Sequence, residues 1–372
     1  MLRHDQNRLY LSHSGMNAML VLVLLIFMSS SVYAQAVPSI PEAHGFGTDP
    51  SFTFLPPSAI DTTAIPNMVL RAEDPADAPL PVFKIAPDTW MFFGNIAEID
   101  QYNRGWNGNA GFIVTPAGVV VIDSLGTPKL GQRIIATIRS VTDKPIRYLI
   151  ITHNHPDHSY GAIAFRRLGG VKVIGHAGTL DYLRSEKIET SVAFRRSFIP
   201  EDMAGFAGVE PDIRVAGERF SAYRFSLGGR DFEVFNVGEH HSYGDLVVYQ
   251  VDQRIVWISD LAFNQRTTFM GDGNSRQAIE AQDWLLKKFS SARLMVPGHG
   301  SAQTAPFSMV ARTQSYIKRL RKVMRRAIAE DVDLMSAVEQ ADFSDWRDTR
   351  LYELNQRANA SFVYRELELE EF

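Results

Sequence analysis

Residues 148–158 read Tyr-Leu-Ile-Ile-Thr-His-Asn-His-Pro-Asp-His. The apolar, β-prone start and the proline-containing polar end predict a buried strand that runs into a loop. Side chains alternate along an extended chain, so His153 and His155 point the same way and could grip one metal ion. Asp157 and His158 follow after a turn and could hold a second ion beside the first. Clustered imidazoles and carboxylates are what a zinc site requires, and ordinary loop packing explains them poorly.

Three later segments add candidate ligands. Residues 238–245 contain two adjacent histidines, His240 and His241, and alternation lets only one of two neighbours face a metal. Asp260 follows the apolar run 255–259, where a carboxylate serves either as a ligand or as a cap or turn residue. His299 stands between two glycines at the end of another short apolar run, where glycine allows the backbone to approach a site closely.

The His-x-His-x-Asp-His pattern of residues 153–158 resembles the signature of the metallo-β-lactamase superfamily of hydrolases, and the resemblance covers about residues 83–305. It implies an α/β fold, the four-layer αββα sandwich. A second motif of the family, Gly-x-x-His-[Ser/Thr]-x-Gly-Asp, matches residues 238–245. The match selects His241 as the ligand and implies that His240 lines the pocket. The resemblance also implies two zinc ions bound by His153, His155 and His241 on one side, Asp157, His158 and His299 on the other, and Asp260 between them.

The same resemblance implies a mechanism, in which a hydroxide bridging the two zinc ions attacks the carbonyl of a β-lactam, a lactone or other ester, or a thioester. Asp157 is then the catalytic residue, because it binds metal and orients the nucleophile. Asp123 supports the metal loop from behind without binding metal. The aspartate at position 260 resembles the glyoxalase II, lactonase and sulfatase branches more than the cysteine-bearing β-lactamases. Iron and manganese are the alternatives to zinc, since His/Asp sites accept several divalent metals.

The amino-terminal segment, residues 1–34, is expected to be a secretory signal peptide. Arg3 and Arg8 precede an apolar core at residues 18–28, and small residues follow that suit cleavage after Ala34 or Ala36. An uncleaved anchor is the alternative, although the core is short for a membrane span. Export predicts a periplasmic or secreted protein that contacts membrane only through this segment. The absence of cysteine from all 372 residues is compatible with that destination.

The composition predicts a globular protein, and the family resemblance implies that it acts on a small molecule. The net charge of −4 gives no push towards nucleic acid, so no nucleic-acid partner is expected and a nuclease is disfavoured. A non-enzymatic metal-binding accessory of a periplasmic quinoprotein or redox system is the competing hypothesis, because the carboxy-terminal tail resembles those of superfamily members found with such systems. The complete set of metal-binding residues counts against it.

The pattern of the chain predicts four parts. A proline-rich arm (35–82) follows the signal peptide and precedes the metallo-β-lactamase domain (83–305), in which strands and helices alternate. Residues 189–215 lack clean periodicity and are expected to form a lid or substrate wall, or a surface loop packed on its own aromatic residues; substrate choice is expected to lie there and in residues 263–276. The last part (306–372) is a helical extension with a solvated basic face.

Overall fold

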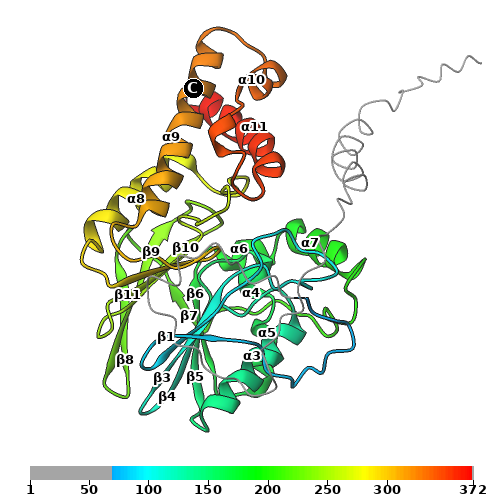
Figure 1. Ribbon diagram of the computed structural model, residues 1–372, viewed down its shortest axis with the longest axis vertical. Helices are drawn as coiled ribbons and strands as arrows, with labels where there is room; N and C mark the ends of the chain where they lie inside the picture. The colour runs from blue at the N-terminus through cyan, green and yellow to red at the C-terminus, as the bar shows by residue number, and fades with distance from the viewer. Residues whose placement is uncertain (1–68, 371–372) are drawn as a thin grey trace, which may run out of the picture. The chain divides into compact units, whose positions relative to one another are not determined.

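The computed structural model describes residues 69–370 (Figure 1). The expected signal peptide and residues 35–68 of the expected arm lie outside the described residues. The described remainder of the arm, residues 69–82, contains turns and no regular element. Among residues 69–370, no helix is both long enough and apolar enough to cross a membrane.

Seven strands form the first sheet, in the order of the chain. Its first four strands are antiparallel and the last four are parallel, so β4 belongs to both sets. The strands are β1 (Phe83–Ala86), β2 (Thr89–Phe92), β3 (Ala110–Thr115), β4 (Gly118–Ile122), β5 (Ile146–Ile150), β6 (Lys172–His176) and β7 (Ile213–Val215).

Five strands form the second sheet, in the order β12-β11-β10-β9-β8. All of its pairs are antiparallel except β11 with β12, which run parallel. The strands are β8 (Ala222–Leu227), β9 (Arg230–Gly238), β10 (Asp245–Gln250), β11 (Ile255–Ser259) and β12 (Leu294–Pro297).

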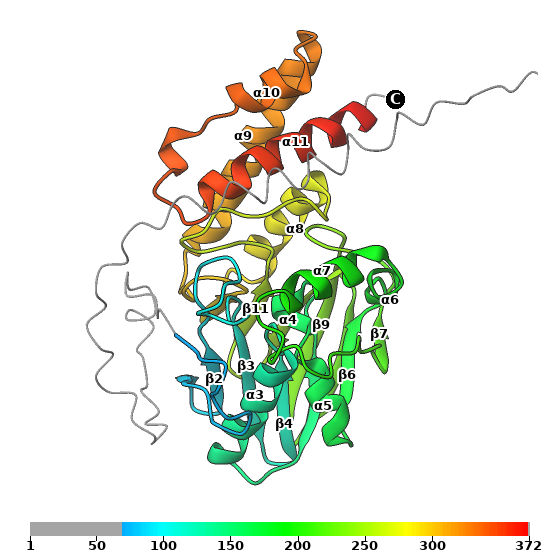
Figure 2. The ribbon, with the colours of Figure 1, turned by 90° about the vertical axis from the view of Figure 1, so that its right-hand side faces the viewer.

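The two sheets pack face to face, with helices outside each of them (Figure 2). Alternate residues of β4 show how the sequence produces these layers. Val120 and Ile122 point into the core between the sheets, whereas Val119 and Val121 point into the core beneath α3 (Pro128–Val141) and α5 (Ala162–Leu168). The second sheet likewise buries its outer face against α8 (Ser275–Lys288) and the start of α9 (Ser308–Ala329). The predicted four-layer αββα sandwich is confirmed.

Residues 189–215 do not form one long loop. Their first part belongs to helix α7 (Glu186–Arg196), and their end forms β7. Ile188 and Val192 of α7, with Ile199 and Met203 beyond it, join a buried cluster with Tyr160 and Tyr182, so much of the segment is core. Two short helices, α4 (Pro156–Ser159) and α6 (Thr179–Leu183), complete this side of the molecule.

The carboxy-terminal extension is helical, as predicted. It consists of α9, α10 (Leu334–Gln340), a 3-10 turn (Ser344–Trp346) and α11 (Tyr352–Glu370). Tyr316 and Leu320 of α9 and Val363 of α11 belong to a separate apolar cluster that these helices share with Met270, a residue of the β11–α8 loop. The extension therefore packs directly on a loop of the sandwich.

Candidate metal centre

The first four candidate ligands lie where β5 passes into α4. Proline at the first position of α4 suits a helix start, and His155 takes the position just before it. Asp123, which follows β4, braces this turn: its carboxylate accepts hydrogen bonds from the Thr152 backbone N–H and from Thr152 Oγ1, both at 2.8 Å. The oxygen that accepts from Thr152 Oγ1, Oδ2, also lies 2.9 Å from His158 Nδ1. Asp123 thus supports the loop from behind, as expected from the sequence.

The other three candidates come from the ends of strands in the second sheet. His241 lies in the turn between β9 and β10, Asp260 follows β11, and His299 follows β12. Because β11 and β12 are parallel neighbours, they deliver Asp260 and His299 to the same edge of the sheet. Gly298 permits this close approach, since a Cβ there would overlap Asp260 Oδ1.

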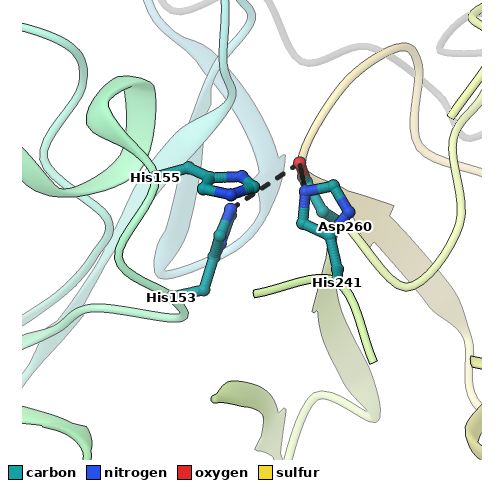
Figure 3. Close-up of side chains that lie close together, drawn as sticks. All are labelled: His153, His155, His241 and Asp260. Atoms are coloured by element: carbon teal, nitrogen blue, oxygen red, sulfur yellow. Dashed lines mark ion pairs between the residues drawn. The ribbon is translucent and has the colours of Figure 1, made fainter. Parts of the chain in front are cut away.

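The structure brings all seven predicted residues together in two adjoining groups. One group is His153, His155, His241 and Asp260 (Figure 3), and the other is Asp157, His158 and His299. Within each group, one donor atom from every residue lies within 4.8 Å of the others. Asp260 touches both groups, with Oδ2 3.1 Å from His241 Nε2 and 3.4 Å from His299 Nε2. Its Oδ1 lies 3.5 Å from His158 Nε2, so this carboxylate is placed between the groups.

The donor atoms fit divalent metal ions. The Nε2 atoms of His153, His158 and His241, and Asp260 Oδ1, are buried and have no hydrogen-bond partner among the described residues. Buried polar atoms are rarely left unpaired, because desolvation without compensation costs about 1–3 kcal/mol each. Imidazole nitrogen and carboxylate oxygen are the ligands that zinc and related ions take in proteins. Four such atoms converging on the same space are therefore best explained as ligands.

One ring nitrogen of His153, of His155 and of His299 is held by a group outside the set of candidate ligands. His153 Nδ1 lies 3.0 Å from Ser259 Oγ, and His299 Nδ1 lies 2.7 Å from the Asn107 carbonyl oxygen. His155 Nε2 lies 3.1 Å from Asp272 Oδ2. Such contacts fix the ring orientation and the tautomer that a metal needs.

Asp272 and Asn107 were not identified from the sequence. Asn107 also donates from Nδ2 to Asp157 Oδ2 at 3.0 Å, and so holds both a ligand carboxylate and, through its carbonyl, a ligand histidine. The flanking glycines of Gly271-Asp272-Gly273 were the one signal in the sequence for a close approach at Asp272. Asn107 lies in a similar Gly-Asn-rich stretch without a recognisable pattern.

The buried aspartates and histidines of the site shift one another's pKa values. Burial would raise the pKa of Asp157 and of Asp260, but the neighbouring imidazoles, chiefly His158 and His299, hold both pKa values well below the usual range. Burial lowers the pKa of His153 well below its usual value. Burial would also lower the pKa of His158, but Asp260, Asp157 and Asp123 raise that pKa to about 10. Without metal, a proton on His158 therefore offsets part of the carboxylate charge.

The histidines excluded from the ligand set lie elsewhere. His240 is buried with Nδ1 3.0 Å from Asp245 Oδ2 and belongs to neither group. His176 Nδ1 accepts from the Gly178 N–H just before α6, and its Nε2 lies 3.0 Å from Asn236 Oδ1. The first geometry agrees with the choice of His241, and the second places His176 at the start of α6 and not among the candidate ligands.

The site opens on one side. The side chains of His155 and Asp157 are 13% and 12% exposed, whereas those of the other five candidates are at most 4% exposed. Phe269 lies beside His155 with ring centroids 6.4 Å apart, and Lys187 of α7 reaches Asp272 at 2.6 Å. A substrate would therefore approach past His155 and Asp157, along a rim formed by α7 and the β11–α8 loop.

Comparisons with known proteins agree with this geometry. Residues 103–308 match the family model of the metallo-beta-lactamase superfamily. Metallo-beta-lactamase IND-1 of Chryseobacterium indologenes is 24% identical over 199 residues, which cover 53% of this chain and 73% of that protein. A linear primary-alkylsulfatase of Pseudomonas sp. is 36% identical, but over only 53 residues, which are 14% of this chain and 10% of the enzyme.

Solved structures show the same fold. The sec-alkylsulfatase Pisa1 of Pseudomonas sp. superposes with a TM-score of 0.62 at 16% identity, over 76% of this chain and 49% of its own. The metallo-β-lactamase VMB-1 gives a TM-score of 0.51 at 17% identity, over 65% of this chain and 97% of its own. This chain thus spans about half the length of the sulfatase. The family match covers more than half of the sequence and includes every candidate ligand, so the chain belongs to the metallo-beta-lactamase superfamily.

Proposed function

We propose that this protein is an exported, dinuclear zinc-dependent hydrolase that cleaves a small ester-like substrate at a carbonyl group. One observation carries the proposal: seven donor side chains form two adjoining groups that share Asp260. Two zinc ions bound there would lower the pKa of water towards neutrality and polarise the carbonyl group. Export rests on the amino-terminal sequence pattern alone.

Asp157 is the residue proposed to act on the attacking water. Its low pKa keeps the carboxylate ionised at neutral pH, so it accepts a hydrogen bond rather than donating a proton. Asn107 and His299 hold one of its oxygens at 3.0 and 3.2 Å, which fixes the direction of the carboxylate. Asp157 also stands on the open side of the site, where a substrate arrives. It is therefore suited to orient water and to bind metal at once.

Three carbonyl substrates are proposed: a β-lactam, a lactone or other ester, and a thioester. A sulfate ester is the second candidate class, because the 36% identical stretch belongs to an alkylsulfatase and because Asp260 occupies the position where cysteine-bearing β-lactamases differ. Phe269 at the open side favours substrates with an apolar group.

The first experiment compares initial rates of the zinc-loaded protein on a chromogenic cephalosporin, an aryl lactone, an acyl thioester and a linear alkyl sulfate. Metal content is measured by mass spectrometry in parallel, and Asp157→Ala is the control. Turnover of one carbonyl substrate by wild type, lost in the variant, supports the proposal. Two bound zinc ions with turnover of the alkyl sulfate alone would reassign the reaction, and a protein that binds no metal would refute the proposal.

A further inference from the structure

The loop between β11 and α8, residues 261–274, forms one wall of the metal centre. Phe263 stacks on His299 with ring centroids 5.5 Å apart and meets His241 edge-on at 5.7 Å. Arg266 Nη1 lies 2.9 Å from His299 Nδ1. Asp272, near the end of the loop, reaches His155. A shift of this loop would therefore reach both groups of candidate ligands.

The loop has no regular structure across most of its length, so something else must hold it. Few of its backbone groups pair with the sandwich. Its middle instead pairs with residues of the carboxy-terminal extension: the Thr267 N–H donates to the Arg350 carbonyl at 2.9 Å, and the Arg350 N–H donates to the Gln265 carbonyl at 3.0 Å. The extension thus supplies the partners that a strand would otherwise provide.

Asn359 of α11 makes the central contact. Its side-chain oxygen accepts from the Met270 N–H at 2.9 Å, and its Nδ2 donates to the Thr268 carbonyl at 2.7 Å and lies 3.0 Å from Tyr316 Oη. The residue is fully buried, and the amide uses both its acceptor and its donors. One turn earlier, Asn355 Nδ2 donates to the Thr267 carbonyl at 3.0 Å.

The hydrogen bonds from Asn355 and Asn359 to residues 267–270, called the clamp below, lie next to Asp272, which is two residues beyond Met270. Asp272 divides its carboxylate between His155 Nε2 at 3.1 Å and Lys187 Nζ at 2.6 Å. Lys187 is itself held over the ring of Tyr243, 5.0 Å from its centre. The far end of the loop is fixed as well, because Glu366 of α11 accepts from the Ser275 N–H at 2.9 Å.

We propose that Asn359 is a positioning residue of the metal centre: it holds residues 267–270 so that Asp272 orients the imidazole of His155. The carboxy-terminal helices are then part of the working site, although they contribute no ligand. The effect on metal rests on the function proposed above, whereas the effect on the loop does not.

Asn359→Ala tests the proposal, with Gln356→Ala as the matched control. Gln356 is also a buried amide of α11 and also pairs with Tyr316, at 2.6 Å, but its other partner is the Ala341 carbonyl and not the loop. Both variants remove one buried amide from the same helix. Only the first frees the loop.

Hydrogen exchange of the metal-free proteins measures how often the backbone amides of the loop become accessible to solvent. In Asn359→Ala, we expect exchange in peptides covering residues 264–275 to rise at least about tenfold, with β11 and β12 unchanged. Zinc affinity, measured by competition with a chromophoric chelator, should fall about 10–100-fold. Gln356→Ala should leave loop exchange and zinc affinity within about twofold of wild type. Equal effects of the two variants on the loop, or an unchanged loop in Asn359→Ala, would overturn the proposal.

Two further variants, Asn355→Ala and Asp272→Asn, separate an effect on folding from an effect on the loop. If Asn359→Ala does not fold, Asn355→Ala removes a single hydrogen bond to the same loop and is judged by the same exchange measurement. Asp272→Asn should weaken zinc binding while leaving exchange at residues 267–270 unchanged, since it lies beyond the clamp. A wild-type protein that binds no zinc would refute the proposed function, and the exchange comparison would still decide whether Asn359 holds the loop.

Discussion

Replacing Asp123 with asparagine should weaken metal binding without changing the shape of the site. Asp123 has a positive φ of 59°, a conformation that asparagine tolerates as well as aspartate does. Its Oδ1 accepts from the Thr152 N–H, and its Oδ2 accepts from Thr152 Oγ1 and faces His158 Nδ1. The variant keeps the volume and the backbone but replaces one of these oxygens with an NH₂ group.

Neither orientation of the new amide satisfies its neighbours. If its oxygen meets the Thr152 N–H, its NH₂ faces His158 Nδ1 and drives the proton of that imidazole to Nε2, the atom that would bind metal. If the amide is reversed, two donors meet at Thr152. An unpaired buried donor costs about 1–3 kcal/mol. Loss of such a supporting group typically lowers metal affinity about 10–100-fold, which is about 1.4–2.8 kcal/mol.

The assay is competition for zinc against a chromophoric chelator, at pH 7.5 and constant ionic strength. Asp333→Asn is the control, because Asp333 is an exposed helix cap of α10, far along the chain from the ligands. We expect the control to bind zinc as wild type does. An Asp123→Asn protein that is folded and binds zinc within about twofold of wild type would refute the reasoning about the tautomer of His158.

Three further predictions concern packing, pH and the extension. Gly298→Ala should displace Asp260 and reduce turnover about a hundredfold, because misplacement by about 1 Å has effects of that size. Gly229→Ala is the control: a new Cβ there meets nothing within 4 Å, and its φ of +76° disfavours alanine, so the variant should lose some stability and retain activity. Equal rates of the two variants would contradict the overlap at Gly298. Without metal, the pKa of His158 is raised from 6.5 to about 10, so the stability it contributes is fully present below pH 6.5 and is lost as pH rises through 10. The melting temperature of the chelated protein should fall across that window, and a flat profile would count against the coupling. Leu320→Ala should lower the free energy of unfolding in urea by about 2–5 kcal/mol, because Leu320 is fully buried in α9; a loss below about 1 kcal/mol would show that the extension contributes little.

The parts of the fold that local patterns encode could be predicted from the sequence. The strand before His153 and the seven candidate ligands were identified because each ligand directly follows an apolar run or lies in a short motif. No helix was predicted at the position of α8, whose buried face includes the small or polar residues Ser275, Ala278 and Gln282. Residues 189–196 were interpreted as loop for a similar reason: the buried face of α7 includes Arg195.

Contacts between distant segments could not be predicted in this way. Asp272 and His155 are 117 positions apart, and no pattern around Asp272 says which histidine it meets. Asn359 is 89 positions from Met270 and reads in the sequence as an ordinary helical residue. The candidate ligands stand in short motifs that carry the family resemblance, whereas the groups that hold them depend on how distant segments pack.

The position of α11 has a consequence for the order in which the site can be completed as the chain emerges. The first sheet and the segment 153–158 precede α11 in the chain, so they can begin to fold before it is present. The wall of the metal centre, however, gains its hydrogen-bond partners only when residues 350–359 have emerged and docked. With Asn359 in the positioning role proposed above, the emerging chain carries four candidate ligands before Asp272 is placed to orient His155, and the site is completed only when α11 has docked.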